Sequence, residues 1–209
     1  ALSSQLTAKD DVEKVSEALE ILSDIEMNLK KIHEHGSRAD SIVKSMLQHS
    51  RGGEGKLEPT DLNALIKEYA NLAFHGMRAG ENPINVDIDL KLDKTVGEVP
   101  LVAEDFSRVI LNLCNNAFDA MREKALSPNP SPSGRGVPEG RGEGEYSPKL
   151  TIRTKKKDSN ITIEIQDNGP GIPDEIKDKI MQPFFTTKKG TAGTGLGLSI
   201  TNDIIKAHG

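Results

Sequence analysis

The sequence predicts an α+β fold: a two-layer α/β sandwich in which helices cover a mixed β-sheet, preceded by one long helix. The first observation is an apolar heptad pattern that runs unbroken through the first quarter of the chain. The second is a strict alternation of apolar and polar residues over 84–92, which is typical of a half-buried strand. The third is that two more strand patterns, at 150–154 and 161–166, are interleaved with helical patterns at 101–124 and 195–208.

Composition limits the classes of function. The chain has 209 residues with 35% hydrophobic and 3% aromatic content and no Trp, so its core is modest and aliphatic. The net charge of −5 provides no basic field, which argues against nucleic acid as a partner. The single cysteine, Cys114, excludes an internal disulfide and favours a reducing compartment. Because no apolar run approaches the roughly 18 residues that span a membrane, we expect a cytoplasmic chain, with any membrane contact made by regions outside this sequence.

Residues 1–51 are predicted to form one long helix. Its apolar residues recur at alternating steps of three and four: Val15, Ala18, Leu22, Ile25, Leu29, Ile32, Gly36, Ala39, Val43 and Met46. Such a helix could pack on its own domain, or it could belong to a dimeric coiled coil or four-helix bundle; the strict heptad period favours the bundle. R-G-G-E-G at 51–55 then breaks the helix, and residues 52–60 are predicted to form a hinge linker.

Residues 61–209 are predicted to form one domain. A helix starts after Pro59-Thr60-Asp61, because Asp is a good N-cap residue. Residues 127–148 are rich in Pro, Gly and Ser without periodicity, so we expect a flexible loop. K-K-K-D-S-N at 155–160 separates two strands and suits a hairpin, whose lysines we interpret as a solvated tip. A short helix is predicted at 174–181.

Two asparagines lie in the middle of the helix predicted at 101–124. Asn112 and Asn116, in the stretch N-L-C-N-N-A-F-D-A, are four residues apart, so both amides leave the same helix face. Two amide oxygens aimed together suit Mg²⁺, which usually takes one or two protein oxygens together with waters and phosphates. The alternative is a polar helix face that is hydrogen-bonded to loops.

Three further stretches are rich in glycines or hydroxyls. D-N-G-P-G-I-P at 167–173 ends a strand on an acid, although taken alone it could be a glycine-tolerant turn. P-F-F-T-T-K-K at 183–189 places hydroxyls and cations after an aromatic pair. In G-T-A-G-T-G-L-G-L-S-I at 190–200, Gly195 and Gly197 open an amphipathic helix, so backbone amides can face an anion. The alternative there is a flexible loop ahead of a helix.

Together these stretches resemble the nucleotide-binding boxes of the ATP-binding domain shared by sensor histidine kinases, gyrase, heat-shock chaperone ATPases and mismatch-repair ATPases. This is the GHKL superfamily, with its Bergerat fold. Its boxes occur here in the family's order: the N box N-L-C-N-N-A, the first glycine box D-N-G-P-G-I-P, the F box P-F-F-T-T-K and the second glycine box G-T-G-L-G-L. The resemblance covers about residues 61–209 and is greatest to bacterial sensor histidine kinases, because of the F box and the short lid between Phe185 and Gly193. The long helix also resembles the second helix of a kinase dimerisation hairpin.

The resemblance implies ATP and Mg²⁺ as ligands. Asp167 would accept a hydrogen bond from the exocyclic amine of adenine. Gly169 and Gly171 would keep side chains out of the space of the base and sugar. Asn116 would be the Mg²⁺ ligand, and Asn112 would orient the phosphates or a water.

The lid would wrap the phosphates with backbone amides. Thr187 and Lys188 would lie near the phosphates, with either Lys188 or Lys189 reaching the γ-phosphate. The catalytic residues implied are thus Asn112, Asn116 and Lys188. The other residues that the resemblance assigns to the nucleotide site are Asp119, Ile172, Phe184, Gly193, Thr194, Gly195, Leu196, Gly197 and Leu198.

The sequence departs from the family's pattern in three places. The acceptor motif, like H-E-[hydrophobic]-x-[NT]-P-L, is absent, and His33-Glu34 keeps only its His–acid pair, so we expect the acceptor helix to lie outside this sequence. Two further strands are expected after the A-H-G at 207–209. Asp119 stands where many histidine kinases carry a phosphate-contacting Lys, so Lys188, Lys189 and the lid amides would contribute more.

The resemblance implies the catalytic part of a two-component sensor histidine kinase. It would transfer the γ-phosphoryl group of ATP to a histidine outside this sequence, for relay to an aspartate in the receiver domain of a response regulator. Homodimerisation through the N-terminal helix is expected. Two alternatives remain: an ATP-hydrolysing conformational clamp like gyrase, which carries a Glu where Asn112 stands, and a non-catalytic nucleotide-binding dimerisation module.

Overall fold

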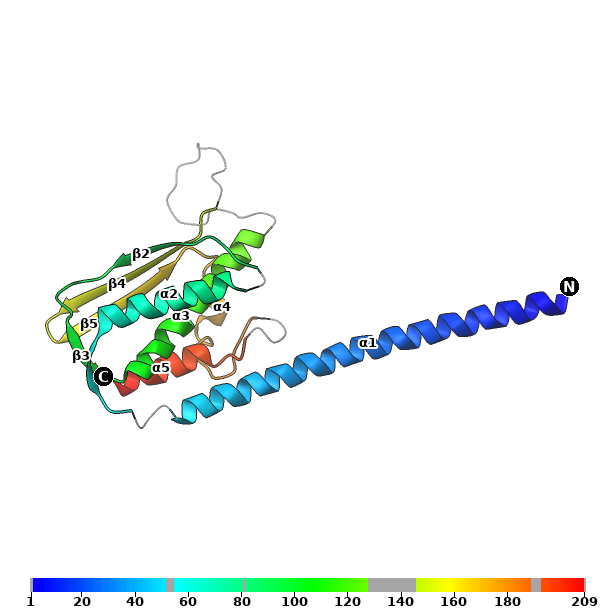
Figure 1. The fold of residues 1–209 in the computed structure, drawn as a ribbon, viewed down its shortest axis with the longest axis horizontal. Helices are drawn as coiled ribbons and strands as arrows, with labels where there is room; N and C mark the ends of the chain where they lie inside the picture. The colour runs from blue at the N-terminus through cyan, green and yellow to red at the C-terminus, as the bar shows by residue number, and fades with distance from the viewer. Residues whose placement is uncertain (1, 52–54, 81, 128–145, 189–192, 209) are drawn as a thin grey trace. The chain divides into compact units, whose positions relative to one another are not determined.

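A computed structural model of the chain describes residues 2–51, 55–80, 82–127, 146–188 and 193–208 (Figure 1). The chain divides into two compact units, Ala1–Gln48 with Thr186–Thr194 and His49–Phe185 with Gly195–Gly209. The first three residues of the predicted hinge linker, 52–54, and most of the predicted flexible loop, at 128–145, lie outside the described residues.

Most of the first unit belongs to α1 (Leu2–Arg51), which is one uninterrupted helix of 50 residues, as the heptad pattern predicts. The apolar side chains described along it are 48–67% exposed: Val15, Leu19, Ile21, Leu22, Ile25, Met27, Leu29, Ile32 and Val43. A helix of this length extends for about 75 Å and depends on side-chain packing rather than on intrinsic propensity for most of its stability. The exposed residues include six heptad positions, Val15, Leu22, Ile25, Leu29, Ile32 and Val43, so the apolar stripe is exposed along the helix.

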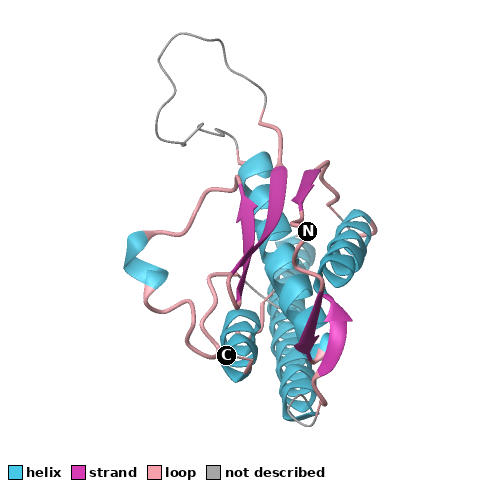
Figure 2. Ribbon diagram, turned by 90° about the vertical axis from the view of Figure 1, so that its left-hand side faces the viewer, coloured by secondary structure: helices cyan, strands magenta, loops and turns pink. Residues whose placement is uncertain are grey.

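In the second unit, three strands form a mixed sheet in the order β2-β4-β5 (Figures 1 and 2). β2 (Asp87–Lys91) pairs in parallel with β4 (Lys149–Lys157). β4 pairs antiparallel with β5 (Asn160–Asp167), which confirms the predicted hairpin. The register sets Asp167 opposite Leu150, which is fully buried. The last residue of β5 thus lies at the margin of the core.

Helices cover this sheet. Figure 1 shows α2 (Leu62–Arg78) and α3 (Ala103–Leu126) beside the strands, with α5 (Gly197–Ala207) against α3. The main core lies between α2, α3 and the sheet; its fully buried members include Ile66, Ile110, Cys114, Met121, Leu150 and Ile152. A smaller cluster joins α5 to α3 through Val109, Leu196, Ile200 and Ile204. The predicted α+β class with helices on a mixed sheet is confirmed.

A second, small sheet was not predicted. β1 (Glu58–Asp61) pairs antiparallel with β3 (Glu98–Leu101), so the helix expected from Leu101 begins at Ala103 instead. Each strand has four residues, and Pro59 faces Pro100 across the pair. Proline argues against a strand in a sequence because it cannot donate a ladder hydrogen bond. Because each strand carries a proline, neither strand was predicted from the sequence.

Two other predicted elements are shorter in the structure. The strand expected at 84–92 is β2, five residues long. The helix expected at 174–181 is α4 (Asp174–Lys177), which buries no residue. Beyond it the chain continues in turns, with the N–H groups of Lys179 and Gln182 bonded to carbonyls three residues back. Without a buried face, packing cannot extend so short a helix.

A hydrogen-bond network joins α2, the β2–β3 connection and β4. Asn63 Nδ2 donates to the Asp93 carbonyl, and the Thr154 hydroxyl donates to Asn63 Oδ1, both at 2.9 Å. The backbone N–H of Asp93 donates to Thr154 Oγ1 at 2.9 Å. The Asp93 carboxylate accepts bonds from the N–H and hydroxyl of Thr95 and from the N–H of Lys156, at 2.9, 2.7 and 3.1 Å. This network fixes α2 against the sheet by directional contacts.

Replacing Asp93 with alanine is expected to lower the free energy of unfolding at neutral pH, and to matter less in acid. Hydrogen bonds from the side chain and backbone of Thr95, then from the backbone of Lys156, hold the pKa of Asp93 below its ordinary value of 3.8. A carboxyl with a lowered folded-state pKa adds stability above its unfolded pKa, and this stability is lost as the pH falls through the folded pKa. Urea unfolding of both proteins at neutral pH and below pH 3.8 measures the difference; a gap that stayed constant would contradict this expectation.

Candidate functional site

The two asparagines of the predicted site lie on one face of α3. Asn112 and Asn116 are half-buried, whereas the intervening Asn115 is exposed. Cys114, between them, points into the core, and burial raises the pKa of its thiol to about 12. A thiol that stays neutral is a packing group rather than a nucleophile. Between positions 112 and 116, the half-buried side chains that could bind a ligand through polar atoms are therefore the amides of Asn112 and Asn116.

The second glycine box contacts α3 at Asn112. Asn112 Nδ2 donates to the carbonyl of Gly197 at 3.3 Å, and a Cβ added at Gly197 would lie 3.6–3.8 Å from the Asn112 side chain. Gly195 has a φ of +69°, and a Cβ there would come within 2.6 Å of the carbonyl oxygen of Phe184. Gly195 is thus required both for its backbone conformation and for this close approach.

The start of α5 has no side-chain cap. Its N-cap residue, Leu196, makes no capping hydrogen bond with its side chain, and the first N–H groups of any α-helix have no acceptor within the helix itself. Leu196 itself is 7% exposed and packs with Val109, Ile200 and Ile204. The predicted nucleotide contact of Leu196 could therefore come only from its backbone, whereas its side chain anchors the helix on α3.

The first glycine box contacts α3 eight residues further on. A Cβ added at Gly169 would lie 2.7 Å from Asp167 Oδ1 and 3.0 Å from the Cβ of Ala120. The N–H of Gly169 donates to Asp167 Oδ1 at 2.8 Å, which turns the carboxylate toward the glycine. Asp167 is exposed at the end of β5. In contrast, Gly171 has open space around it and is required for its φ of +81°.

α3 therefore arranges the predicted boxes in a line. The second glycine box touches it at Asn112, the first glycine box touches it at Ala120, and Asn116 lies midway. Eight residues of helix span about 12 Å. An elongated ligand lying along this face would meet an acid and a turn at one end, an amide oxygen in the middle, and backbone N–H groups at the other.

The acid at Asp119 has a cation beside it that sequence reasoning missed. Arg122 Nη1 donates to Asp119 Oδ1 at 2.7 Å, and Arg122 Nε donates to the Asn82 carbonyl at 2.9 Å. The spacing of three residues between the acid and the arginine, which suits a helix-surface ion pair, was the available signal. Arg122 thus compensates the negative charge at the position where many histidine kinases carry a lysine.

Four other residues predicted to bind the nucleotide are exposed or half-buried. Ile172 is 48% exposed, and Phe184 is 49% exposed with a φ of +67°. Gly197 and Leu198 are half-buried in the first turn of α5. A non-glycine residue with positive φ is uncommon, so the backbone of Phe184 is held in a conformation that its sequence does not favour.

Part of the predicted lid, within Thr186–Thr194, belongs to the first unit. The N–H of Lys188 donates to Thr186 Oγ1 at 3.1 Å, and a Cβ added at Gly193 would lie 2.7 Å from the same oxygen. The roles predicted for Thr187, Lys188, Gly193 and Thr194 at the phosphates remain predictions. Lys189 lies outside the described residues.

The last turn of α5 is tied to the start of α3 by His208. The Val102 N–H donates to His208 Nε2 at 3.2 Å, and His208 Nδ1 lies 2.8 Å from the Ile204 carbonyl. These two bonds assign the proton to Nδ1. The imidazole also packs edge-on against Phe106, with 4.9 Å between ring centroids. Both ends of α5 are therefore bonded to α3, at Asn112 and at Val102.

Replacing Gly169 with alanine is expected to lower the free energy of unfolding by about 1–3 kcal/mol, because the new methyl group must displace Asp167 or Ala120. Urea unfolding measures the change. The matched control is Gly76→Ala, since Gly76 lies inside α2 with nothing within 4 Å of an added Cβ. That change should stabilise the protein by about 0.5–1 kcal/mol. Equal effects of the two substitutions would contradict the close approach at Gly169.

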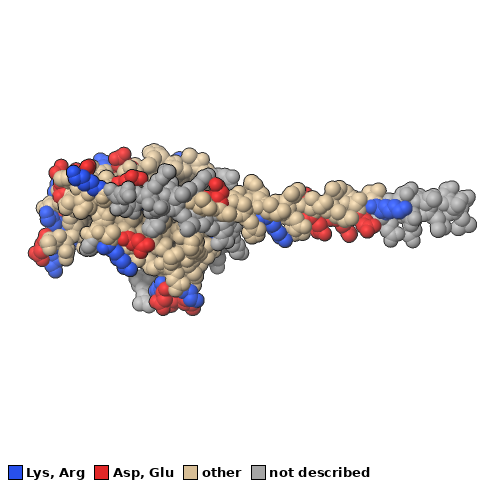
Figure 3. Space-filling view, turned by 90° about the horizontal axis from the view of Figure 1, so that it is seen from below, with Lys and Arg blue, Asp and Glu red and all other residues tan. Residues whose placement is uncertain are grey.

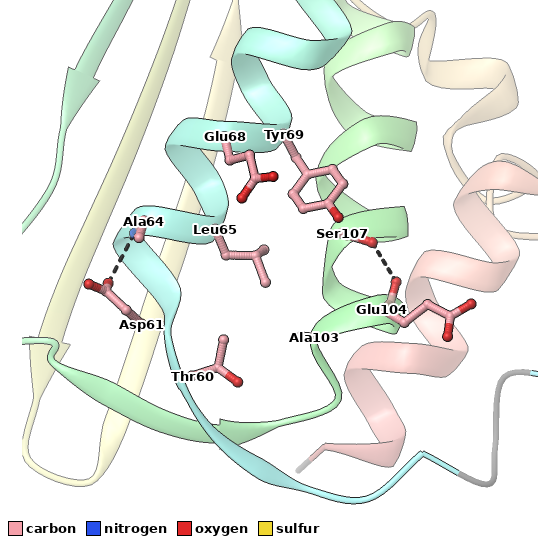
Figure 4. Close-up of a pocket in the computed structure, with 9 residues that line it drawn as sticks. All are labelled: Thr60, Asp61, Ala64, Leu65, Glu68, Tyr69, Ala103, Glu104 and Ser107. Carbon is pink, nitrogen blue, oxygen red and sulfur yellow. Dashed lines mark hydrogen bonds between the residues drawn. The ribbon is translucent and has the colours of Figure 1, made fainter.

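A depression of about 450 Å³ lies elsewhere, between the first turns of α2 and α3 (Figure 4). It contains none of the predicted site residues. Two of its polar groups serve the helices: Asp61 Oδ1 caps α2 by accepting from the Ala64 N–H at 3.0 Å, and the Ser107 hydroxyl donates to the Glu104 carbonyl at 2.7 Å. Its residues thus help to start the two helices.

Charged side chains are mixed on the face drawn in Figure 3, where Lys and Arg alternate with Asp and Glu among the described residues. The described Lys and Arg residues drawn there form no broad basic patch. This agrees with a net charge of −5. Among the described residues, no helix has the length and apolar content needed to cross a membrane.

Comparisons with known proteins agree on one family. The family described as "Histidine kinase-, DNA gyrase B-, and HSP90-like ATPase" matches residues 102–209, just over half of the chain. Sensor kinase CckA of Brucella abortus (strain 2308) is 32% identical over 184 residues, which cover 87% of this chain and 18% of CckA. Sensor protein FixL of Bradyrhizobium diazoefficiens is 28% identical over 185 residues, which cover 88% of this chain and 32% of FixL. The chain thus spans about a fifth to a third of the length of these curated relatives.

Solved structures agree. The catalytic domain of histidine kinase ThkA, in a nucleotide-free form, matches with a TM-score of 0.54 and 29% identity over 73% of this chain and 82% of that one. ThkA in complex with the response regulator protein TrrA matches with a TM-score of 0.58 and 26% identity over 85% of this chain and 42% of that one. The predicted resemblance to sensor histidine kinases is confirmed. The chain belongs to the family of histidine kinase-, DNA gyrase B- and HSP90-like ATPases.

Proposed function

We propose that this chain is the ATP-binding catalytic region of a two-component sensor histidine kinase. It transfers the γ-phosphoryl group of ATP to a histidine outside this sequence, and the phosphoryl group then passes to an aspartate of a response regulator. The observation that carries the proposal is the order of groups along α3: the Asp167–Gly169 turn at Ala120, Asn116 in the middle, and the glycines before α5 at Asn112.

The adenine end of the nucleotide lies at Asp167 in this proposal. One carboxylate oxygen, Oδ1, is held by the N–H of Gly169, and no hydrogen bond to Oδ2 exists within the described part of the chain. Oδ2 is therefore free to accept from the exocyclic amine of adenine. Guanine presents a carbonyl at that position, so the acid would face an acceptor and GTP would bind more weakly.

The triphosphate end lies at Asn116 and at the start of α5. The amide oxygen of Asn116 is a ligand type that Mg²⁺ accepts, so Asn116 would hold the ion together with phosphate oxygens and waters. Bound Mg²⁺ neutralises charge on the phosphates. Asn112 is held by its bond to Gly197, which orients it toward the same end. The uncapped first turn of α5 supplies N–H donors for phosphate oxygens, and Lys188 or Lys189 adds a cation.

Phosphoryl transfer requires in-line placement and charge neutralisation more than acids and bases. The nucleophile is a neutral histidine nitrogen, which attacks the γ-phosphorus as the bond to the leaving oxygen of ADP breaks. Asn116, Lys188 and the amides of the second glycine box hold the phosphates for this attack. Asp119 is paired with Arg122, so its negative charge is compensated there.

The partners follow from the same proposal. The exposed apolar stripe of α1 pairs with its copy in a homodimer, as a heptad pattern favours. The receiver domain of a response regulator takes the phosphoryl group; ThkA, which is similar to this chain, has been solved with the response regulator protein TrrA. Because ATP is the substrate, this region works in the cytoplasm, and any membrane segment belongs to other parts of the protein.

Two measurements test the proposal. Titration calorimetry with a non-hydrolysable ATP analogue and Mg²⁺ should show binding to the 209-residue chain. Radiolabelled ATP should then label a separate polypeptide that carries a histidine-kinase acceptor helix, and should label it only when the chain is present. Absence of analogue binding would overturn nucleotide binding. Binding with no label on the acceptor would overturn the kinase activity.

The same assay distinguishes the alternatives. A conformational clamp would hydrolyse ATP steadily without any acceptor. In the proposed kinase, Asn112 stands where such clamps carry a glutamate and is bonded to Gly197, so steady hydrolysis should be negligible. A non-catalytic module would bind nucleotide and dimerise, but it would neither hydrolyse ATP nor label the acceptor.

A further inference from the structure

The Asn168–Gly169 turn, which follows Asp167, is hydrogen-bonded by side chains that lie outside the nucleotide boxes. Lys124, in the last turns of α3, directs its ammonium group at two successive backbone carbonyls, those of Asn168 at 3.0 Å and Gly169 at 3.4 Å. Lys124 is half-buried, so these bonds are made by a side chain whose position is restricted. Hydrogen bonds from a charged donor are about twice as strong as neutral ones.

Tyr146 contacts both Lys124 and Asn168. Its ring lies beneath the same ammonium group, with 4.8 Å between Lys124 Nζ and the ring centroid, the geometry of a cation–π contact. Its hydroxyl lies 3.1 Å from Asn168 Oδ1 and 3.3 Å from the Asn168 carbonyl, so it can donate to either. Burial, and then the charge of Asp167, raise the pKa of Tyr146, which keeps the hydroxyl protonated as a donor.

Asn168 is held on its other side as well. Its Oδ1 accepts from the N–H of Lys149 at 2.9 Å, and its Nδ2 donates to the carbonyl of Ser147 at 2.8 Å. The backbone of residues 168–169 is thus bonded to the end of α3 and to the segment that enters β4. The same backbone supplies the Gly169 N–H that holds Asp167 Oδ1 at 2.8 Å.

We propose that Lys124 and Tyr146 are positioning residues for base recognition: by fixing the Asn168–Gly169 turn, they aim the carboxylate of Asp167 at the adenine ring. The inference rests on the proposed function, because it assigns them to the adenine end of that same site. Neither residue needs to touch the nucleotide. A rigid first contact with the base requires such a supporting set of bonds, since a carboxylate at an exposed strand end otherwise rotates freely.

A positioning role and a general contribution to folding stability predict different changes in the affinities for ATP and GTP. A loosened turn weakens the bond between Asp167 and adenine and leaves the phosphate contacts at the other end of α3 intact. The affinity for ATP should therefore fall more than the affinity for GTP, which gains little from Asp167. A loss of overall folding would lower both affinities together.

The experiment compares four variants of the 209-residue chain by calorimetry with Mg²⁺ and either ATP analogue or GTP analogue. Lys124→Met and Tyr146→Phe should each reduce the ratio of ATP to GTP affinity by about three- to tenfold, the size of one or two hydrogen bonds. Lys124→Arg should retain most of the ratio, because arginine keeps the positive charge, has N–H groups that can donate to the two carbonyls, and can lie over the Tyr146 ring. Lys155→Met, at the exposed tip of the β4–β5 hairpin, is the matched control and should leave the ratio unchanged.

The outcomes separate this inference from the proposed function. If the unaltered chain binds the ATP analogue and Lys124→Met keeps the full ratio, the positioning role is wrong while the proposed function stands. A parallel fall in both affinities would also overturn it in favour of a structural role. If the unaltered chain binds no analogue, the proposed function fails and this role fails with it.

Discussion

Replacing Asp167 with alanine is expected to weaken ATP binding by roughly ten- to a hundredfold and to remove the preference for ATP over GTP. The loss is that of one hydrogen bond to a charged acceptor, which contributes about 1.5–3 kcal/mol. In the unaltered chain the Gly169 N–H donates to Asp167 Oδ1 at 2.8 Å. The same substitution removes this acceptor. Calorimetry with non-hydrolysable ATP and GTP analogues in the presence of Mg²⁺ measures both affinities.

Asp167→Asn separates the two roles of this carboxylate. Asparagine keeps an oxygen for the Gly169 N–H but presents an NH₂ group where the adenine amine needs an acceptor. We expect it to lose the preference for ATP nearly as fully as alanine does, with a smaller change in folding stability. Glu175→Gln, an acid-to-amide change at an exposed position of α4, is the control and should leave both affinities unchanged. Wild-type discrimination in Asp167→Asn would contradict adenine recognition by this acid.

The elements with strong periodicity were predictable from the sequence, and those without it were not. The heptad stripe of α1 and the alternation in β5 each repeat several times, so local pattern and tertiary packing agree. β1 and β3 are four residues long with prolines at facing positions, so only their mutual pairing defines them. The end of α4 was also missed, because its helical residues have no buried face to signal where packing stops.

In the candidate site, too, some features could be predicted from the sequence and others could not. Asn112 and Asn116 could be placed on one face of a helix because helical spacing fixes it. The contacts between the boxes could not be predicted, since Gly169 meets Ala120 and Gly197 meets Asn112 across 49 and 85 positions of sequence. Lys124 and Tyr146 carry no pattern at all in the sequence; their role depends on how the end of α3 meets the turn after β5. Arg122 alone had a local signal, its spacing from Asp119.

Replacing Asn116 with alanine should reduce phosphoryl transfer to an added acceptor polypeptide by about 10²–10³-fold. In the proposed site, the Asn116 amide oxygen holds the cation that neutralises the phosphates, and the loss of one such electrostatic contact lowers reaction rates by about this factor. ATP-analogue affinity measured with Mg²⁺ should fall toward the affinity measured with a chelator, because the part of binding that depends on the metal is lost. The helix should not suffer, since alanine is the best helix former.

The matched control is Asn115→Ala on the same helix. Asn115 is exposed and lies about 100° around α3 from Asn116, so the two substitutions are chemically identical and differ only in the face they alter. Asn115→Ala should transfer phosphate at the rate of the unaltered chain and keep its dependence on Mg²⁺. Equal losses in both variants would point to a general effect on α3, and full activity in Asn116→Ala would place the metal elsewhere. A loss confined to Asn116 would tie catalysis to the face of α3 that both glycine boxes contact.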